Sequence, residues 1–319
     1  MVYNSMRMWQ GANGISPCDG IVSPAYTVLM PKRSITNGYF SALFKSPTLI
    51  NEFRKNSQGM TSDTWNLKYP QIETIKVCIP SLSEQKRVAD MLGTLDKRIA
   101  KQALLVDSLK KYKRGVVRTL LSPETCNLKD VQWSRDTIGN LGSFIKGAPL
   151  SKADISETGT PFILYGELYT TYHEVITSVV RKTGAKVDPI YRSIVGDVLI
   201  PSSGETPEEI STASCVMLPG VILAGDLNIF RSSRVDGRII SYILNHIVNG
   251  SIARVAQGKS IVHVQASEIS KIEISYPDPE TQNRIIKVLE IISSRVESCE
   301  KELDNLTKLR SSLLQQLFI

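Results

Sequence analysis

Two stretches that lie far apart in the chain carry the same order of apolar and polar positions. The first is Ile79–Ser122 and the second is Tyr276–Ile319. They align without a gap, so that Gln85 falls on Gln282. In both, apolar residues recur at alternating steps of three and four, which is the period of an α-helix that packs along one narrow face. Each stretch is therefore predicted to be one long helix.

The apolar positions keep a seven-residue repeat over several heptads, which is typical of a coiled coil. The repeat is interrupted at matching points, at Gln102 and Lys113 in the first copy and at Cys299 and Arg310 in the second. Two unrelated amphipathic helices would not share these interruptions, so we expect the helices to pair as an antiparallel coiled coil. The predicted interface consists of Val88, Leu92, Leu95, Ile99, Val106, Leu109, Val116, Leu120, Ile285, Leu289, Ile292, Val296, Leu303, Leu306, Leu313 and Leu317.

The start of each helix carries a capping signal. Ser81 is followed three residues later by Glu84, which is the spacing of a capping box. In the second copy Asp278 is the candidate cap, and Pro279 fits the first helical position, where its missing N–H costs nothing. Both helices are expected to begin directly after these caps.

The segments before the helices repeat more faintly. Helix-like runs occupy Tyr39–Phe53 and Ile239–Val255, and strand-like runs occupy Ala25–Met30 and Ile222–Phe230. The first segment is about half as long as the second and has no counterpart of residues 134–197. A domain that lacks half its strands buries less apolar surface and leaves strand edges open. We expect this first segment to be less stable than the second, or to be completed by another chain.

Short apolar runs between the helices alternate with Gly and Pro, which is typical of strands in a mixed α/β domain. The expected strands are Leu141–Ile145, Pro161–Tyr165, Val175–Val180, Val195–Ile200, Ser214–Leu218 and Val221–Phe230. The predicted fold class is α+β, with mixed α/β domains that alternate with the two paired helices. The predicted boundaries are 1–78 for a partial N-terminal domain, 79–122 for the first helix, 123–278 for a complete domain and 279–319 for the second helix.

The formal net charge is +7, and the basic excess lies in the first part of the chain. Residues 79–122 hold ten Lys or Arg against four Asp or Glu, whereas residues 123–278 hold fourteen against seventeen. A basic face of this kind is typical of a polyanion-binding surface, and a solvated helix face explains it equally well. The basic cluster near the end of the first helix consists of Lys110, Lys111, Lys113, Arg114 and Arg118.

Other features of the sequence exclude several classes of protein. The five cysteines are scattered without a C-x-x-C pair, and the first residues lack the apolar core of a signal peptide. No stretch approaches the roughly 18 apolar residues of a membrane span. These features predict a reduced, cytoplasmic protein that has no membrane partner.

The sequence shows no arrangement of residues typical of an enzyme. It has no phosphate-binding loop, no N-P-P-Y or D-P-P-Y tetrapeptide of the DNA methyltransferases, and its three histidines are isolated. Asp197 and Glu205 are conceivable as an acid and a base, but a Gly-Asp turn before a strand explains Asp197 more simply. We therefore expect a non-catalytic protein without a metal site, which recognises a partner.

These patterns together resemble the DNA specificity subunits of type I restriction-modification systems. Long helices that close each half of a twofold internal repeat are similar to the spacer helices of that family, and the order and spacing of shorter motifs are similar to its target-recognition domains. The resemblance covers essentially the whole chain. The shorter motifs are Val2–Asn4, Met8–Ala12, Gly196–Pro201, Ala224–Asn228, Gln257–Lys259 and Ile261–His263.

The resemblance implies a function in DNA recognition. Each target-recognition domain would read one half of a split double-stranded DNA target from the major groove, and the paired spacer helices would hold the domains apart and dock methylase (modification) subunits. A restriction subunit would join this core. Catalysis, S-adenosylmethionine, ATP and Mg would belong to these partners, with no cofactor in this chain.

The chain departs from the family pattern in its first recognition domain, which is apparently truncated at the N-terminus. It resembles truncated specificity chains, and one complete domain would still work if a second copy, or another specificity chain, associated through the spacers. Two other functions stay open at this point. One is an inactive or decoy coiled-coil adaptor that binds methylase subunits without reading DNA, and the other is a stand-alone DNA-binding regulator.

Loops that follow strands within residues 134–278 are the expected DNA contacts. Polar side chains there are suited to base edges, and Lys or Arg to phosphates. For each residue singly, a solvated loop is an equally good explanation. The candidates are Lys146, Lys152, Ser202, Ser203, Glu205, Arg254, Gln257 and Lys259, and a second group consists of Arg181, Lys182, Lys186, Arg231 and Arg234.

Overall fold

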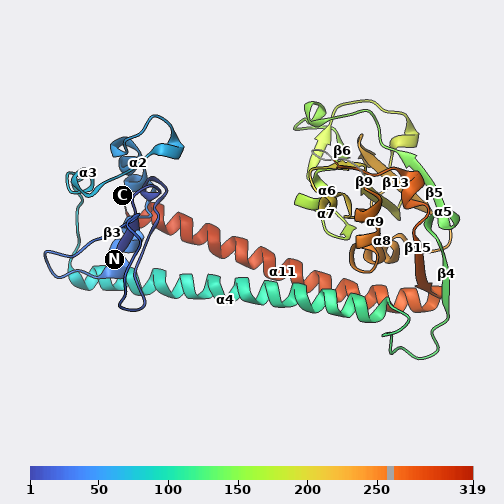
Figure 1. The fold of residues 1–319 in the computed structure, drawn as a ribbon, viewed down its shortest axis with the longest axis horizontal. Coiled ribbons are helices and arrows are strands. Elements are labelled where there is room, and N and C mark those ends of the chain that lie inside the picture. The colour runs from blue at the N-terminus through green and yellow to red at the C-terminus, as the bar shows by residue number, and fades with distance from the viewer. Residues whose placement is uncertain (257–261, 319) are drawn as a thin grey trace. The chain divides into compact units, whose positions relative to one another are not determined.

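Both stretches with the heptad pattern form single helices of 39 residues, α4 (Leu82–Leu120) and α11 (Pro279–Leu317). The computed structural model describes residues 1–256 and 262–318. Its chain divides into two units (Figure 1). Unit 1 consists of Met1–Ser108 and Arg295–Ile319, and unit 2 consists of Leu109–Ser294. Each unit therefore combines one of the faintly repeated segments with parts of both long helices.

The predicted capping signals start both helices. The N–H of Ser81 donates to Glu84 Oε2 (3.0 Å) and the N–H of Glu84 donates to Ser81 Oγ (3.4 Å), which is a capping box. Asp278 Oδ1 accepts the N–H of Thr281 (3.0 Å), and Pro279 is the first residue of α11. Local sequence therefore sets where each helix begins.

The two helices pack on each other in opposite directions. In unit 1, Arg98 Nη2 lies 2.8 Å from Glu302 Oε1, and further along α4 Gln102 Nε2 donates to the carbonyl of Cys299 (2.9 Å). The contacts therefore move forward along α4 while they move backward along α11. The predicted antiparallel pairing is therefore confirmed, and with it the α+β fold class.

Two polar residues that interrupt the apolar repeat of α4 are buried, and Gln102 bonds across the seam to α11. Gln102 and Lys113 are both buried. All the apolar positions expected in the interface are buried or half-buried except Leu317, which is 38% exposed. Phe318 is buried instead, and its ring packs against that of Tyr39 with 5.3 Å between centroids. The end of α11 thus turns its apolar side toward a helix of unit 1, which a heptad pattern alone does not predict.

The centre of unit 2 is a five-stranded sheet of order β5-β13-β9-β11-β7. Neighbouring strands are antiparallel, except β11 and β7, which are parallel. Strands β9 and β13 lie inside the sheet, and most of their residues are buried, including Val198, Leu199 and Ile200 of β9 and Ile229 and Phe230 of β13. The strands are β5 (Gly142–Lys146), β7 (Val175–Ile176), β9 (Asp197–Pro201), β11 (Ser214–Val216) and β13 (Leu227–Ser232).

Smaller sheets and short helices surround this sheet. The pairs β15-β4 and β10-β14 and the three-stranded sheet β12-β6-β8 consist of β4 (Trp133–Thr137), β6 (Thr160–Ile163), β8 (Arg181–Thr183), β10 (Ser203–Gly204), β12 (Ile222–Leu223), β14 (Val262–His263) and β15 (Glu273–Pro277). The helices are α5 (Ile138–Leu141), α6 (Glu167–Thr170), α7 (Pro207–Ile210), α8 (Gly237–His246), α9 (Asn249–Val255) and α10 (Ala266–Ile269).

Unit 1 is built around the three-stranded antiparallel sheet β2-β1-β3. Its core includes Tyr3, Met8, Phe53 and Leu67, and residues of α4 and α11 pack against it. The elements are β1 (Val2–Asn4), β2 (Asn13–Gly14), β3 (Tyr26–Val28), α1 (Asn37–Leu43), α2 (Pro47–Asn56) and α3 (Tyr69–Ile72).

Some elements expected from the sequence are divided in the structure. The expected helix Tyr39–Phe53 is two helices, because Ser46 caps a new helix that begins at Pro47. The expected helix Ile239–Val255 is likewise α8 and α9. The expected strand Val221–Phe230 is two strands separated by a turn. Among the described residues, no helix is both long enough and apolar enough to span a bilayer.

The faint sequence repeat corresponds to equivalent backbone hydrogen bonds in the two units. In unit 1 the N–H of Leu67 donates to the carbonyl of Ser5 (2.8 Å), and in unit 2 the N–H of Val264 donates to the carbonyl of Ser202 (3.0 Å). Leu67 and Val264, like Ser5 and Ser202, are offset by the 197 residues that also separate Gln102 and Cys299. The units therefore share a scaffold, although unit 1 has fewer strands.

Candidate nucleic-acid interface

Three loops of unit 2 meet at one end of the five-stranded sheet. Lys146, the last residue of β5, stands opposite Asn228 on β13, and Asn228 stands opposite Ile200 on β9. The end of β5, the end of β9 and the start of β13 are therefore level. The loops that leave these strand ends contain four of the DNA-binding candidates from the sequence, Lys146, Lys152, Ser202 and Glu205.

Backbone contacts fix these loops to one another. The N–H of Ser202 donates to the carbonyl of Asp226 (2.8 Å), which itself has a left-handed φ of 59°. A Cβ on Gly147 would lie 1.6 Å from the carbonyl oxygen of Ala224, so only glycine allows this approach. The loops thus have a defined conformation, which a surface that reads base edges requires.

Lys152 stands on a rigid turn beside a cleft of about 380 Å³. Ser151 caps that turn by accepting the N–H of Ala153, and its own N–H donates to Asp154 (2.7 Å). Lys152 is exposed and lines this cleft together with Tyr165 and Asp226. A cationic group and a ring at one cleft suit a phosphate and a base edge.

Glu205 begins an acidic part of the same region. Its N–H donates to Glu209 Oε2 (2.8 Å), within a capping box that starts α7. Burial raises the pKa of the nearby Tyr169 phenol, and the charges of Glu209 and Glu205 raise it further. An exposed carboxylate repels phosphate but accepts a hydrogen bond from a cytosine amino group. Glu205 therefore suits base reading and not backbone contact.

Ser203 is the least accessible of the described candidates. Ser203 is buried, and it pairs with His263 in the β10-β14 ladder. Its neighbour Ser202 is half-buried and uses its N–H and carbonyl in backbone bonds, which leaves its hydroxyl as the group that could contact DNA. Arg254 is exposed in the last turn of α9. The candidates Gln257 and Lys259 lie outside the described residues.

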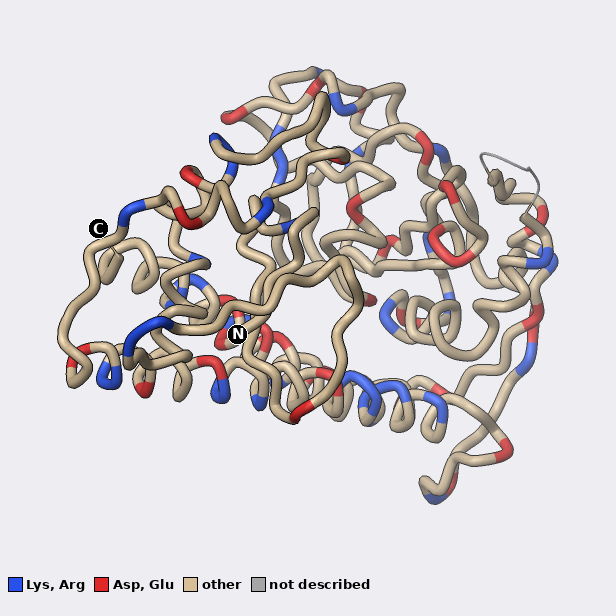
Figure 2. The backbone as a smooth tube through the Cα atoms, turned by 60° about the vertical axis from the view of Figure 1, so that its left-hand side comes forward, with Lys and Arg blue, Asp and Glu red and all other residues tan. Residues whose placement is uncertain are grey.

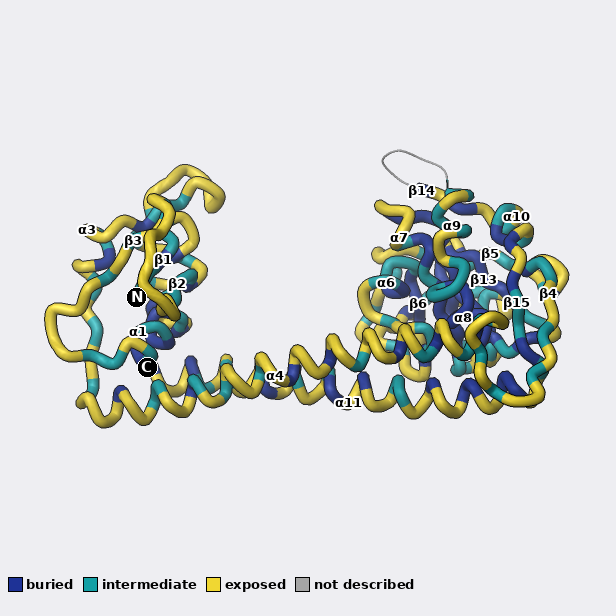
Figure 3. Tube along the Cα trace, turned by 60° about the horizontal axis from the view of Figure 1, so that its bottom comes forward, coloured by how far each residue is buried: buried dark blue, intermediate teal, exposed yellow. Residues whose placement is uncertain are grey.

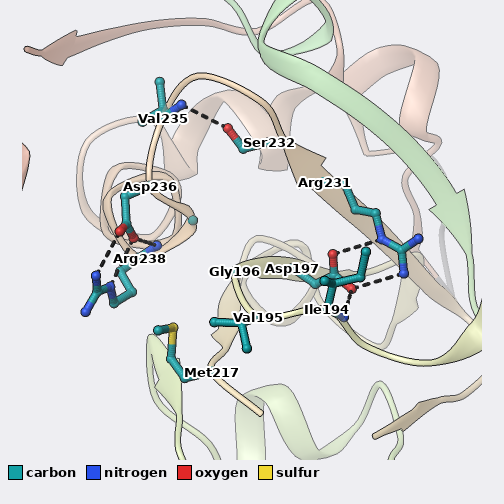
Figure 4. Close-up of a pocket in the computed structure, with 11 residues that line it drawn as sticks. Ile194, Val195, Gly196, Asp197, Met217, Arg231, Ser232, Val235, Asp236 and Arg238 are labelled. Carbon is teal, nitrogen blue, oxygen red and sulfur yellow. Dashed lines mark hydrogen bonds and ion pairs between the residues drawn. The ribbon is translucent and has the colours of Figure 1, made fainter. Parts of the chain in front are cut away.

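One basic residue of the second group has a structural function. Arg231 Nε lies 3.0 Å from Asp197 Oδ1 (Figure 4). Arg231 Nη2 also donates to the carbonyl of Arg192 (2.9 Å). Asp197 also accepts the N–H of Ile194 (2.9 Å). Burial raises the pKa of Asp197, and the bonds from Arg231 and Ile194 act against that rise. The structural explanation of Asp197 as a turn residue therefore agrees with its contacts, and Arg231 is committed to the same turn.

The basic cluster near the end of α4 also contains both a residue with a structural role and residues that are exposed. Lys113 is buried and donates to Glu174 Oε2 (2.7 Å), whose other oxygen lies 2.6 Å from His246 Nε2. Burial alone would raise the pKa of Glu174, but His246 and Lys113 hold it well below its usual range. Arg114 and Arg118 are exposed and line a cleft of about 320 Å³. Figure 2 shows that several Lys and Arg positions follow one another along a stretch of a long helix. These two arginines, and not Lys113, are the basic groups that α4 presents at this cleft.

Sequence reasoning missed the tyrosines of this surface. Tyr165 and Tyr169 lie with ring centroids 6.5 Å apart, and Tyr165 lines the cleft beside Lys152. The four-residue spacing of the two tyrosines did not predict that they lie together, because the short helix α6 that carries Tyr169 is too short to show a helical periodicity in the sequence. Within residues 1–256 and 262–318, no three acidic, His or Cys side chains are arranged to hold a metal ion.

Comparison with known proteins gives a consistent set of relatives. A family model described as "Type I restriction modification DNA specificity domain" matches residues 10–106 and 130–308. The type I restriction enzyme MjaVIII specificity subunit of Methanocaldococcus jannaschii is 21% identical over 98% of this chain and 77% of its own length. The putative type I restriction enzyme MjaX specificity subunit of the same organism is 24% identical over 88% of this chain and 66% of its own length.

Two solved structures have a similar fold. The S subunit of a type I restriction-modification system from M. genitalium superposes with a TM-score of 0.60 at 17% identity, covering 88% of this chain and 72% of that chain. A chain from a structure on complex assembly and conformational transition of the type I R-M system gives a TM-score of 0.54 at 16% identity, covering 86% of this chain and 69% of that chain. These likenesses support the fold seen here.

Proposed function

Because the chain belongs to the family of type I restriction-modification DNA specificity domains, we propose that it is the DNA-recognition subunit of such a complex. It reads a double-stranded target and brings methylase and restriction subunits to that site. The chain itself is non-catalytic and acts on cellular DNA in the cytoplasm. S-adenosylmethionine, ATP and Mg belong to the partner subunits.

The observation that carries this proposal is the loop-bearing end of the five-stranded sheet in unit 2. Lys146 ends β5, and Lys152, Ser202 and Glu205 follow in neighbouring segments; backbone contacts hold the loops after β5 and β9 to the segment before β13. Rigid loops with an exposed cation, a hydroxyl and a carboxylate combine the phosphate contact that positions a protein with the base contacts that specify a sequence.

The long helices supply a surface for partner subunits. Helices α4 and α11 bury one side in their own pairing, while their outer faces are exposed (Figure 3). Several large apolar residues of the two helices are exposed to solvent. We assign this surface to the methylase subunits. The exposed apolar residues are Met91, Leu104, Leu105, Tyr112, Val288, Ile291 and Leu309.

Co-expression with a methylase subunit, followed by sequencing of modified bases in the host DNA, tests the proposal. New methylation at a defined motif is expected. An inverted-repeat motif would show that two copies pair and that the complete domain reads both halves, whereas an asymmetric split motif would show that unit 1 also reads DNA. A complex that forms without any new methylation would contradict DNA reading and favour the decoy adaptor.

A matched pair of variants places the contact surface. Lys146→Ala combined with Lys152→Ala is expected to weaken DNA binding by at least about tenfold and to reduce its salt dependence, because both ammonium groups face phosphates. Lys129→Ala is the control, since Lys129 is also exposed but precedes β4 and is not part of these loops. Unchanged affinity and salt slope in the double variant would remove this surface.

A further inference from the structure

Two arginines near the end of α4 carry charges that no carboxylate neutralises. Among the described residues Arg114 and Arg118 form no ion pair, whereas Lys113 beside them lies 2.7 Å from Glu174. Arg118 Nε donates to the carbonyl of His246 (3.4 Å), which leaves its Nη groups as donors. A guanidinium without a carboxylate partner is suited to a phosphate, to which it can donate two parallel hydrogen bonds.

The end of α4 is fixed on unit 2, so the two guanidinium groups are anchored to a rigid scaffold. Val117 of α4 and Leu121 directly after the helix are buried in the core of that unit, and Lys113 is buried as well. Arg114 and Arg118 stand four residues apart, and residues with this spacing lie on the same side of a helix. Neighbouring phosphates of one ligand can therefore contact both side chains.

The cleft beside the arginines has a floor whose charges are already paired. It measures about 320 Å³, and its lining includes both arginines, Glu174 and His246. Glu174 Oε1 lies 2.6 Å from His246 Nε2, and Oε2 accepts a hydrogen bond from Lys113. Because one carboxylate already binds both of these groups, the two arginines are the cationic partners that the cleft offers to an anion.

The charges are distributed unevenly around the cleft. Tyr169 lines another part of it, and the pKa of this phenol is raised by burial and further by the carboxylates of Glu209 and Glu205. These carboxylates repel an anion from that part of the cleft. Asn249 is exposed at the cleft and adds neutral amide donors. An anion is therefore favoured where α4 supplies the wall.

The cleft adjoins the surface that carries the DNA-binding candidates. The ring centroid of Tyr169 lies 6.5 Å from that of Tyr165, and Tyr165 lines the neighbouring cleft of about 380 Å³ together with Lys152. The two clefts thus meet at one pair of rings. Successive phosphates of a DNA strand lie about 3.4 Å apart along the helix axis, so a duplex on the loops presents a whole row of phosphates. DNA is therefore the source of phosphate nearest to the arginines.

We propose that Arg114 and Arg118 bind phosphate groups of the DNA backbone, next to the part of the target that the loops of unit 2 read. This proposal rests on the function proposed above, because that function supplies the DNA. Such contacts carry no sequence information, but they fix the position of the duplex. Because both arginines belong to α4, the long helix itself holds the duplex in addition to the recognition loops.

Salt-dependent binding of a random-sequence DNA duplex tests the proposal, because phosphate contacts do not depend on sequence. The unaltered full chain is compared with a variant that carries Arg114→Gln and Arg118→Gln. The variant is expected to bind at least about tenfold more weakly at low salt, and its slope of log K against log salt is expected to be smaller by about 2. An unchanged slope overturns the proposal.

Two further variants separate a phosphate contact from a general effect of charge. Arg284→Gln combined with Lys287→Gln removes the same charge from exposed positions of α11 that do not line the cleft, and is expected to keep the slope of the unaltered chain. Equal reductions in this control and in the arginine variant overturn the proposal. Arg114→Lys combined with Arg118→Lys keeps both charges and is expected to retain most of the slope.

A measurement on the unaltered chain excludes an effect of the substitutions on folding. Phenylglyoxal modifies accessible guanidinium groups, and mass spectrometry of the fragments identifies them. The duplex is expected to protect Arg114 and Arg118 and to leave Arg284 reactive. Equal modification with and without the duplex overturns the proposal. Equal protection by inorganic phosphate at the same phosphate concentration also overturns it, because the cleft would then bind a free anion and not the DNA backbone.

Failure of this proposal is distinguishable from failure of the proposed function. If the arginine variant binds the duplex like the unaltered chain while Lys146→Ala with Lys152→Ala loses affinity, only the contact from α4 is wrong. If the unaltered chain binds no duplex, either alone or with a methylase subunit, both proposals are wrong.

Discussion

Gln85 and Gln282 occupy equivalent positions in the two copies of the repeat, and each ties the start of its long helix to its own unit by the same pair of hydrogen bonds. Gln282 is buried. Its Nε2 donates to the carbonyl of Pro277 (2.8 Å), and its Oε1 accepts the N–H of Asp236 (2.9 Å). Asp236 is the residue before α8, so one amide joins the starts of α11 and α8.

Gln85 makes the same bonds in unit 1. Its Nε2 donates to the carbonyl of Pro80 (3.0 Å), and its Oε1 accepts the N–H of Thr36 (3.0 Å), the residue before α1. At this position one side-chain amide must both donate to a backbone carbonyl and accept a backbone N–H. A glutamine side chain does both, which explains why glutamine is present in both copies.

Replacement of Gln282 by leucine tests this junction. Gln282→Leu leaves a buried N–H and a buried carbonyl without their side-chain partner, and is expected to lower the free energy of unfolding by about 1–3 kcal/mol. Urea unfolding of the full chain measures the change. Gln315→Leu, on an exposed position of the same helix, is expected to change it by less than about 0.5 kcal/mol. Equal losses in the two variants would contradict a specific role for the amide.

Gly147→Ala tests the rigidity of the candidate DNA surface. The added Cβ would lie 1.6 Å from the carbonyl oxygen of Ala224, so the two loops must move apart. We expect a loss of about 1–3 kcal/mol in stability, together with a loss of sequence-specific DNA binding. Gly184→Ala is the matched control, because nothing lies within 4 Å of a Cβ added there. Retained DNA specificity in Gly147→Ala would show that the loops need not be held together.

The long helices were predictable because their signals are local. Heptad spacing and the caps at Ser81 and Asp278 depend on residues within a few positions of each other, and the structure follows them. The matching interruptions at Gln102 and Cys299 also indicated the pairing of the helices. The end of α11 differs, because Phe318 is drawn toward Tyr39, a contact of long sequence separation.

The candidate site was less predictable because its residues are placed by distant partners. Lys113 belongs to a basic run in the sequence, but Glu174, 61 residues later, takes it out of solvent. Ser203 lies in a polar loop pattern, yet its pairing with His263 buries it. Such partners depend on the strand order of the sheets, which no local pattern specifies.

The Lys113–Glu174–His246 contact predicts a pH dependence of stability. The pKa of Glu174 is lower in the folded chain than its ordinary value of 4.5, so its carboxylate contributes stability fully above that value. The contribution is lost as the pH falls toward the folded-state pKa. At pH 7, Glu174→Gln is expected to cost about 3 kcal/mol, because it leaves the buried Lys113 without its partner.

Urea unfolding midpoints between pH 7 and pH 3 measure this effect. The difference between the unaltered chain and Glu174→Gln is expected to shrink as the pH falls below 4.5. Glu208→Gln, at an exposed position of the same unit, is expected to follow the unaltered chain throughout. Parallel curves for Glu174→Gln and the unaltered chain would show that the carboxylate charge does not stabilise the fold.

Gln102 offers the clearest test of why the seam contains polar residues. Its amide donates to the carbonyl of Cys299, and both residues are buried where apolar side chains would otherwise meet. A buried polar residue in a coiled coil fixes register at a cost in stability. Gln102→Leu is therefore expected to raise the free energy of unfolding by about 1 kcal/mol while weakening the preference for one register. Lys101→Leu, on the exposed side of α4, is the control.

Register is measured separately from stability. Cysteines placed at Asp96 and Arg310, whose side chains are in contact, are expected to be joined by a short bismaleimide cross-linker in the unaltered seam. In Gln102→Leu the same pair is expected to be cross-linked less completely, because slipped registers separate these positions. Higher stability with undiminished cross-linking would mean that the apolar heptads alone determine the register and that Gln102 serves another purpose.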